Sequence, residues 1–426
     1  MSNHVTAPKG TKDILPADAG RWQHVEAMAR ELFKAYRYQE IRTPVFESTD
    51  LFQRGIGENT DIVGKEMYTF ESKSDDPTKR LSLTLRPENT AGVVRAYIQH
   101  KLFAQPLPQK LWYTGPMFRY ERPQAGRQRQ FHQLGVEVLG SDDARWDAEV
   151  IVVATDFLAR LGLPALEVQL NSVGDDACRP AYRDTLQAYL RSHQDALCEN
   201  CRTRTEKNPL RVLDCKVPAC QPVVQAAPTI TENLCDGCRG HQAAVEGYLT
   251  AVGVAFKRND RLVRGLDYYT RTVFEIVSGD LGAQNTVCAG GRYNGLVEEL
   301  GGPSTPAVGW GLGLERLLML LPADATPATG LTALIMATHG AAEPVAFRLA
   351  HDLRGQGLAI DLANGGKLDK QFKQAERLGA RYAVILGEDE LAKGVVSIKD
   401  LTTREQRSVP LDGVKDALKG AVAGGK

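Results

Sequence analysis

The pattern of apolar residues changes near residue 322, and this change limits most strongly how the chain can fold. Pro322-Ala-Asp-Ala-Thr-Pro-Ala-Thr-Gly330 is rich in proline and small residues, as linkers are. Beyond it, strands are expected at 331–337, 358–362 and 382–386, and helices at 342–355 and 367–378. This alternation predicts a small α/β domain over 331–426 with a mostly parallel sheet.

The residues before the linker show no such regular alternation. Residues 18–36 carry apolar side chains at helical spacing and predict an amphipathic helix. Residues 39–47 predict a strand that Pro44 interrupts, which suits a sheet edge or an interface. Further strands are expected at 80–85, 110–119, 135–139 and 167–171, with helices at 88–100 and 147–161. Strands with so few strand–helix–strand units predict a largely antiparallel sheet and an α+β fold.

A segment of different character, residues 175–240, separates two strand-rich stretches. It holds charged helical stretches and most of the cysteines, and six of the eight in the chain fall between Cys198 and Cys238. We interpret it as an insertion, which divides the chain into 1–174, 175–240, 241–321, the linker 322–330 and 331–426. The 426 residues exceed the roughly 250–300 that one hydrophobic core supports, so several domains are expected.

Net charge and hydropathy do not indicate a nucleic-acid or membrane partner. Lys+Arg and Asp+Glu both number 52, so a nucleic-acid partner would need a local basic patch. The N-terminus resembles no signal peptide, and no apolar run reaches the roughly 18 residues that span a bilayer. We therefore expect a cytoplasmic protein without a membrane partner.

The chain lacks a G-x-x-x-x-G-K-[ST] loop and a G-x-G-x-x-G loop, so a nucleotide would have to be held by side chains. Arginine suits this role because its rigid, charged fork matches phosphate oxygens. Arg119 lies in Gly115-Pro-Met-Phe-Arg-Tyr-Glu-Arg-Pro123, before a basic loop, and the chain returns through Phe131-His-Gln-Leu-Gly-Val-Glu137. Gln133 and Glu137 share one strand face by spacing, and we expect Arg119 on it too. Such a polar face predicts a ligand site, because buried charges are costly unless paired.

Two further stretches carry polar or glycine-rich patterns. Arg264-Gly-Leu-Asp-Tyr-Tyr269 continues to Glu275 and is read as a strand, with Asp267, Tyr269 and Arg271 on one face and Tyr268 on the other. The turn at its start would place Arg264 near bound anions, with the phenols lining a pocket. Val308-Gly-Trp-Gly-Leu-Gly313 allows close approach of a backbone or a flat ligand, and Arg316 follows in reach of a phosphate.

Together these stretches resemble the class II aminoacyl-tRNA synthetases, and within them the histidyl-tRNA synthetase family. The helix and strand ending in Pro44-Val-Phe-Glu47 resemble motif 1, Phe118-Arg-Tyr-Glu-Arg-Pro123 with Phe131-His-Gln133 resembles motif 2, and Gly311-Leu-Gly-Leu-Glu-Arg316 resembles motif 3. Arg264-Gly-Leu-Asp-Tyr-Tyr269 and Ala289-Gly-Gly-Arg-Tyr-Asn-Gly295 are more specific and resemble the two histidine signatures. Asn89 stands where bacterial relatives usually carry glycine.

The resemblance implies an antiparallel catalytic sheet of six or seven strands, an insertion domain and a C-terminal anticodon-binding domain. It implies ATP-dependent charging of tRNA(His) with L-histidine by a homodimer, with Mg²⁺ on the outer phosphates. Arg119 and Arg264 would be catalytic and bind the α-phosphate, and Arg316 would bind the γ-phosphate. Histidine would be bound by Glu88, Thr90, Gln133, Glu137, Tyr268, Tyr269 and Tyr293. Gln124 and Arg127 would meet the acceptor end of the tRNA, and some basic residues of 367–377 the anticodon arm.

The cysteines form a separate motif. Cys198-Glu-Asn-Cys201 and Cys235-Asp-Gly-Cys238 are two C-x-x-C pairs, which predict a structural zinc site with those four cysteines as ligands. Because Cys215 and Cys220 lie between the pairs, which four of the six would bind stays open. Reduced, partly buried thiols are the alternative.

Two other functions compete with this interpretation. One is the regulatory subunit of the first enzyme of histidine biosynthesis, a non-enzymatic relative that lacks the anticodon domain. The other is a class II synthetase for threonine, proline or glycine. Retention of Arg119, Arg264, Arg316 and the C-terminal domain argues against the first, and the segment 264–269 argues against the second.

Overall fold

The computed structural model describes residues 4–57, 60–163, 166–264, 266, 268–280, 285–322 and 330–423. The chain separates into two compact units between residues 326 and 327, inside the segment that the sequence predicts as a linker. No helix in the described ranges is long and apolar enough to cross a membrane.

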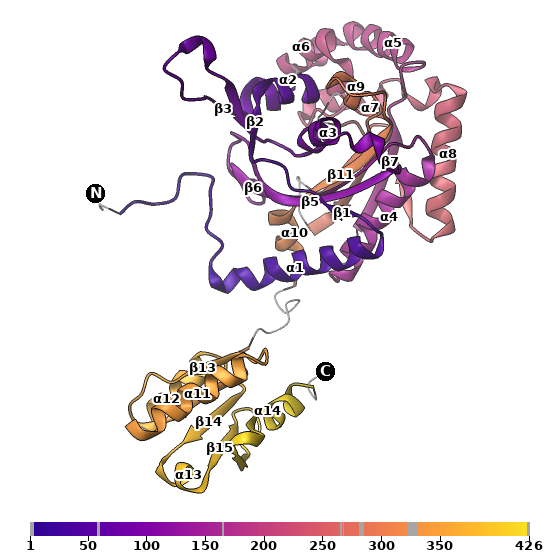
Figure 1. The fold of residues 1–426 in the computed structure, drawn as a ribbon. Coiled ribbons are helices and arrows are strands. Elements are labelled where there is room, and N and C mark those ends of the chain that lie inside the picture. Colours follow the sequence, from indigo (N-terminus) through magenta and orange to yellow (C-terminus); the bar gives the residue numbers. More distant parts are fainter. Residues whose placement is uncertain are drawn as a thin grey trace. The chain divides into compact units, whose positions relative to one another are not determined.

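An eight-stranded sheet forms the centre of the first unit (Figure 1). In spatial order its strands are β1 (Gln39–Glu40), β5 (Gln109–Phe118), β6 (Gln130–Leu139), β11 (Ala307–Gly313), β10 (Thr286–Arg292), β9 (Thr270–Ser278), β7 (Leu166–Ser172) and β8 (Phe256–Arg258). The six central strands are antiparallel, and the short strands β1 and β8 pair in parallel at the edges. The predicted α+β class is therefore confirmed, with two edge strands added.

One face of this sheet carries the main apolar core. Side chains alternate along β6, so Leu134, Val136 and Val138 are buried on this face. The helices that cover it are α1 (Pro16–Ala35), α4 (Ala144–Arg160), α8 (Asp236–Ala251) and α10 (Leu314–Leu320). Trp310 of β11 also points into this core, and its indole Nε1 donates to the carbonyl of Val150 at 2.8 Å.

The opposite face holds the polar side chains of the central strands. Gln133 and Glu137 of β6 lie on it, as their even spacing predicts. Helices α2 (Thr49–Ile56), α3 (Thr90–Gln99) and α9 (Leu296–Glu299) belong to this side, together with a small antiparallel sheet of β2 (Phe46–Ser48), β4 (Ser82–Leu85) and β3 (Tyr68–Glu71). Because α3 shields only part of this face, a cavity remains above β6 and β11.

Two predicted strands differ in the structure. The strand expected at 39–47 is split, with Pro44 between β1 and β2, which join different sheets. The strand expected from Arg264 begins only at Thr270. Arg271 has φ 50°, and the pairing with β10 shifts between Gly291 and Arg292, so the predicted alternation of side chains fails there. Asp267 lies outside the described residues.

The cysteine-bearing segment packs around its own hydrophobic cluster. Helices α5 (Arg179–Ser192), α6 (Glu199–Lys207) and α7 (Gln221–Ala226) contribute to it, as does the first turn of α8. The cluster also takes in Val173 and Val273 of the main sheet region and Tyr269. The segment is thus joined to the residues that follow Arg264, which matters for the site below.

The second unit has a five-stranded sheet in the order β13 (Ile360–Leu362), β12 (Ala333–Ala337), β14 (Tyr382–Leu386), β15 (Val395–Asp400) and β16 (Gln406–Pro410). Its helices are α11 (Glu343–Arg354), α12 (Leu368–Arg377), α13 (Glu388–Lys393) and α14 (Val414–Ala423). The pairs β13–β12 and β12–β14 are parallel, whereas β14–β15 and β15–β16 are antiparallel. The expected mostly parallel sheet is therefore half antiparallel, because β15 and β16 each run back beside the strand before them, β15 after the short helix α13.

Candidate functional site: two adjoining polar cavities

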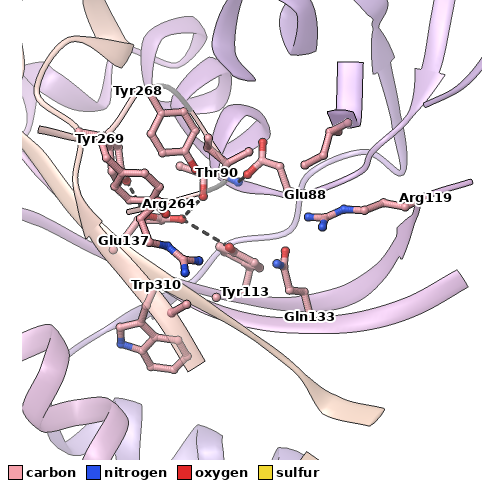
Figure 2. A pocket seen from close by; sticks show the side chains of 16 residues that line it. Glu88, Thr90, Tyr113, Arg119, Gln133, Glu137, Arg264, Tyr268, Tyr269 and Trp310 are labelled. Carbon is pink, nitrogen blue, oxygen red and sulfur yellow. Dashed lines mark hydrogen bonds between the residues drawn. The ribbon is translucent and has the colours of Figure 1, made fainter. Parts of the chain in front are cut away.

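A cavity of about 160 Å³ lies on the α3 face of the main sheet (Figure 2). Polar and aromatic side chains of the central strands, and of the loop and helix segments beside them, line it. They are Glu88, Thr90, Tyr113, Arg119, Gln133, Glu137, Arg264, Tyr268, Tyr269 and Tyr293, with Ile62, Leu266, Ala289, Gly309, Trp310 and Gly311. All seven residues predicted to bind histidine are therefore brought together here.

Glu137 lies at the centre of this cavity. Its side chain is 1% exposed, and its carboxylate accepts from Thr90 Oγ1 at 2.7 Å, from the Tyr113 hydroxyl at 3.4 Å and from the Tyr293 hydroxyl. Burial raises its pKa to about 8, against the lowering effect of the hydroxyl donors. The three donors fix the carboxylate in place before any ligand arrives.

The glycines of β11 make room for these side chains. A Cβ on Gly309 would clash with Glu137 Oε2, and one on Gly311 would lie 2.9 Å from Gln133 Nε2. The sequence predicts that a backbone or a flat ligand approaches these glycines closely. In the structure, the groups that do so are side chains of the neighbouring strand β6. Without the glycines, neither Glu137 nor Gln133 could lie flat along the sheet.

Glu88 lies at the entrance of α3 rather than within a strand. Its carboxylate accepts from the backbone N–H groups of Thr90 at 2.6 Å and Ala91 at 2.9 Å, which caps the helix. Burial raises its pKa. Asn89, next to it, accepts from the Thr43 hydroxyl at 2.6 Å and from Arg86 at 3.2 Å, so its amide ties the loop to the segment after β1.

Tyrosine rings form one wall of the cavity. The rings of Tyr268 and Tyr269 lie 4.7 Å apart, and those of Tyr268 and Tyr293 lie 5.5 Å apart. Burial raises the pKa of all three phenols, so they stay neutral and can donate hydrogen bonds at neutral pH. Arg264 lies over the ring of Tyr269 at 6.0 Å.

A second, larger cavity of about 460 Å³ adjoins the first. The two share Arg119, Gln133, Arg264, Ala289 and Gly311 in their walls. Arg127, Lys216 and Arg316 line the larger one together with Glu121, Glu275 and Glu315. A small polar pocket therefore opens into a larger one lined by both cationic and acidic side chains, and two arginines, Arg119 and Arg264, stand at the junction.

Hydrogen bonds, an ion pair and an aromatic contact orient the arginine side chains of the cavities. Arg119 Nε donates to the carbonyl of Pro87 at 2.9 Å, and its guanidinium lies 5.3 Å from the Phe131 ring. Arg264 pairs with Glu275, whose other oxygen accepts from Thr286 Oγ1 at 3.0 Å. Arg316 donates to the carbonyl of Thr286 at 3.0 Å.

The sequence alone does not indicate all of the residues that line the cavities. Tyr113 lies in none of the motifs, and Glu275 only ends the stretch that begins at Arg264; strand pairing shows both to be in the site. Tyr113 lies opposite Gly135, and Glu275 opposite Ala289. Alternation of side chains along β5 and β9 would have placed both residues on the cavity face, but only if the register of these strands with their neighbours had been known.

The residues predicted to meet tRNA lie at the tip of the loop between β5 and β6. Gln124 and Arg127 exchange backbone hydrogen bonds of 3.1 and 2.9 Å across a tight turn. Gln124 is exposed, whereas Arg127 is partly buried and pairs with Glu121 at 3.0 Å. Gly126 in this turn has φ 70° and abuts Arg316, so the loop tip closes one side of the larger cavity.

The cysteines do not meet as predicted. Cys198 and Cys201 lie with Cys215 and Cys220, whereas Cys235 and Cys238 lie with Asp175 and Cys178. The two C-x-x-C pairs are thus in different clusters. The first pair lies at the start of α6 and the second at the start of α8, and these two helix ends are apart in the fold. No cysteine lines either cavity among the residues that the structure describes.

Comparison with known proteins identifies the family. A family model described as histidyl-tRNA synthetase matches residues 10–317, and one described as anticodon binding domain matches residues 332–421. Histidine–tRNA ligase of Moorella thermoacetica is 53% identical over 413 residues, 96% of each chain. That of Pelotomaculum thermopropionicum is 51% identical over 425 residues, 99% of each chain. The crystal structure of apo S. aureus histidyl-tRNA synthetase has a TM-score of 0.82 and 37% identity, over 98% of this chain and 100% of that one.

The antiparallel sheet, with its small polar pocket beside an arginine-lined cavity, is the arrangement of a class II aminoacyl-tRNA synthetase. A separate unit with its own sheet matches the anticodon-binding model. On the family match and on identities above 50% across almost the whole chain, this chain belongs to the histidyl-tRNA synthetase family.

Proposed function

We propose that the two cavities bind the two substrates of histidine activation side by side. The chain is an ATP-dependent histidine–tRNA ligase, as its family membership implies. The observation that carries the assignment of sites is the pair of arginines, Arg119 and Arg264, in the wall that both cavities share. An α-phosphate there would face the carboxylate of an amino acid in the smaller pocket.

The smaller pocket suits histidine. Imidazole offers one N–H donor and one acceptor, which a carboxylate and a phenol can satisfy together. Glu137 and Tyr268 supply these groups, and Tyr269 and Tyr293 close the pocket. Glu88 and Gln133 stand on the side near Arg119 (Figure 2) and, together with Thr90, would take the α-amino group. A site that hydrogen-bonds a polar side chain discriminates strongly against analogues that lack it.

Activation needs no protein base. The carboxylate of free histidine is ionised at neutral pH, since its pKa lies far below 7. It attacks the α-phosphorus of ATP, its oxygen–phosphorus bond forms, and the bond to pyrophosphate breaks. Arg119 and Arg264 would neutralise the charge that grows on the α-phosphoryl oxygens, while Arg316 would hold the γ-phosphate.

The larger cavity has donors that fit a divalent cation. Glu121, Glu275 and Glu315 line it, and Mg²⁺ prefers carboxylate and phosphate oxygens. When bound with ATP, Mg²⁺ would neutralise charge on the outer phosphates. Zinc would be structural in this scheme, since the described lining of both cavities holds no cysteine.

The second step uses the tRNA. The terminal ribose hydroxyl of tRNA(His) would attack the activated carbonyl, releasing AMP. Gln124 and Arg127 lie at the exposed loop tip beside the larger cavity, which supports their contact with the acceptor end. In the second unit, Lys367, Lys370, Lys373 and Arg377 are all exposed on and before α12, where an anticodon arm could be met.

A homodimer is supported by an exposed apolar patch. Phe46 and Phe70 of the small sheet are 51% and 43% exposed, with ring centroids 6.1 Å apart, and Leu81 beside β4 is 63% exposed. Clustered exposed aromatics are unusual on a monomer surface and mark interfaces. The patch includes the strand that resembles motif 1.

One experiment tests the substrate assignment. ATP–pyrophosphate exchange is measured with each of the twenty amino acids, followed by charging of total tRNA with those that are active. Exchange should depend on histidine and should lead to charging of one tRNA species. Exchange with threonine, proline or glycine alone, or none with any amino acid, would contradict the proposal.

A further inference from the structure

We infer that the cysteine-bearing segment binds two zinc ions, one in each of two separate clusters. The first cluster is Cys198, Cys201, Cys215 and Cys220, and the second is Asp175, Cys178, Cys235 and Cys238. In each cluster one ligand atom from every residue lies within 4.8 Å of all the others. The inference does not rest on the proposed function, because no cysteine of either cluster touches the described walls of the two cavities.

The spacing within the first cluster fits one tetrahedral ion. Zn–S bonds of about 2.3 Å set tetrahedral sulfurs about 3.8 Å apart. Cys198 Sγ and Cys215 Sγ are 4.0 Å apart. That distance is far beyond the roughly 2.05 Å of a disulfide. Four sulfurs this close together leave room for a single ion, and an S₄ set is typical of zinc.

The second cluster has the same geometry with one oxygen. Cys178 Sγ and Cys238 Sγ are 3.8 Å apart. Asp175 Oδ1 lies 3.6 Å from Cys178 Sγ and 3.7 Å from Cys235 Sγ. With a Zn–O bond of about 2.0 Å, a tetrahedral oxygen and sulfur lie about 3.5 Å apart. Sequence spacing could not include Asp175 and Cys178, which are about 60 residues from the pair that they join.

The surroundings of both clusters favour thiolates. Backbone N–H groups point at the sulfurs: those of Cys198 at Cys220 Sγ, 3.2 Å, and of Val217 at Cys215 Sγ, 3.4 Å. In the second cluster, Cys238 N–H points at Cys235 Sγ, 3.4 Å, and Asp175 N–H at Cys178 Sγ, 3.4 Å. Such donors stabilise metal-bound thiolates and orient the ligands.

The second cluster is also fixed by its outer partners. Arg271 Nε lies 3.2 Å from Asp175 Oδ2, which leaves Oδ1 turned toward the sulfurs. Arg179, one residue after Cys178, donates to the carbonyl of Tyr269 at 2.6 Å. An ion here would therefore join the starts of α5 and α8. Through Arg179 it would also help to fix the backbone at Tyr269, which lines the smaller cavity.

Metal analysis of the full-length protein tests the inference. Protein purified under reducing conditions and incubated with Zn²⁺, then desalted, should retain two equivalents of zinc. Cys201→Ser and Cys238→Ser should each retain about one, and the double variant none. Cys288→Ser, which changes a buried cysteine outside both clusters, should retain two.

A single equivalent in the wild type that both variants abolish would show one shared site, and less than about 0.2 equivalents would show none; either result overturns the inference. If a variant fails to fold, X-ray absorption of the wild type decides. An average near three and a half sulfurs per zinc at about 2.3 Å fits one S₄ and one S₃O site. Disulfides among these cysteines in reduced protein, detected by mass spectrometry, would also overturn it.

Discussion

Arg264 and Glu275 form an ion pair at the junction of the two cavities, and both side chains are less than one-fifth exposed. Arg264 lies in the loop before β9 and Glu275 in the middle of that strand, so the strand itself aims the guanidinium. Thr286 of the neighbouring strand holds the other carboxylate oxygen at 3.0 Å. Arg264 is thus oriented before ATP binds, which is what electrostatic stabilisation of a phosphoryl transition state requires.

Replacement of Arg264 should abolish most activation while leaving the protein folded. We expect Arg264→Ala to lower histidine-dependent ATP–pyrophosphate exchange by about 100-fold or more, the usual effect of removing one group that stabilises transition-state charge. Glu275→Gln, which keeps the shape but loses the ion pair, should lower it by roughly 10-fold. Arg261→Ala is a matched control, since Arg261 donates to the carbonyls of Pro228 and Gln225 and lines neither cavity in the described part of the chain. Near-normal exchange in Arg264→Ala would refute the role.

The glycine at position 309 should be required for histidine binding. A methyl group there would clash with Glu137 Oε2, so Gly309→Ala must displace the carboxylate or the strand. We expect the KM for histidine to rise by about 10-fold or more in the exchange assay, with a smaller change in the KM for ATP. Gly247→Ala, in α8 with open space around it, should leave both constants unchanged. An unaltered histidine KM in Gly309→Ala would show that Glu137 does not contact the ligand.

Glu137 should make the stability of the ligand-free protein depend on pH. Its pKa is raised from 4.5 to about 8. Between these values the folded state keeps a proton that the unfolded chain has lost, so the contribution is full below pH 4.5 and is lost as the pH rises toward 8. Within that window, the free energy of unfolding should fall by up to about 1.4 kcal/mol per pH unit more than in Glu137→Gln.

Urea unfolding of both proteins at pH 5, 6, 7 and 8 measures this difference. Glu88, whose pKa is also raised by burial, is present in both proteins and largely cancels in the comparison. Parallel pH profiles for the two proteins would mean that Glu137 is ionised in the folded state across the whole range.

The loop tip should matter for tRNA and not for activation. We expect Gln124→Ala and Arg127→Ala to leave pyrophosphate exchange within about twofold and to lower the rate of tRNA charging by roughly 10-fold. Arg127 faces the larger cavity and pairs with Glu121, so a moderate exchange defect confined to Arg127→Ala would place it at ATP instead. Arg122→Ala, at an exposed position of the same loop, is the comparison variant.

The exposed aromatic patch should hold two copies of the chain together. We expect the double change Phe46→Glu and Phe70→Glu to convert a dimer to a monomer, as measured by light scattering after size exclusion. Burying two carboxylates in an apolar interface is costly unless they are paired. Tyr248→Glu, a similarly exposed aromatic position on α8, should leave the mass unchanged. A wild-type protein that is monomeric at all concentrations would contradict the expectation.

The sequence by itself determined the class of fold, and it indicated a division near residue 322 and most of the residues that line the two cavities. These features are local: strand alternation puts Gln133 and Glu137 on one face, and motif spacing marks Arg119, Arg264 and Arg316. Six central strands are antiparallel, as the scarcity of crossover helices predicts.

Only the tertiary structure decided what depends on register and on distant contacts. The shift at Arg271 moved the start of β9, so Tyr268 and Tyr269 form a wall before the strand instead of alternating within it. Strand pairing placed Tyr113 and Glu275 in the site. The fold also separated the two C-x-x-C pairs. It placed Cys215 and Cys220 beside the first pair and the distant residues Asp175 and Cys178 beside the second, because these contacts depend on how α5, α6 and α8 pack.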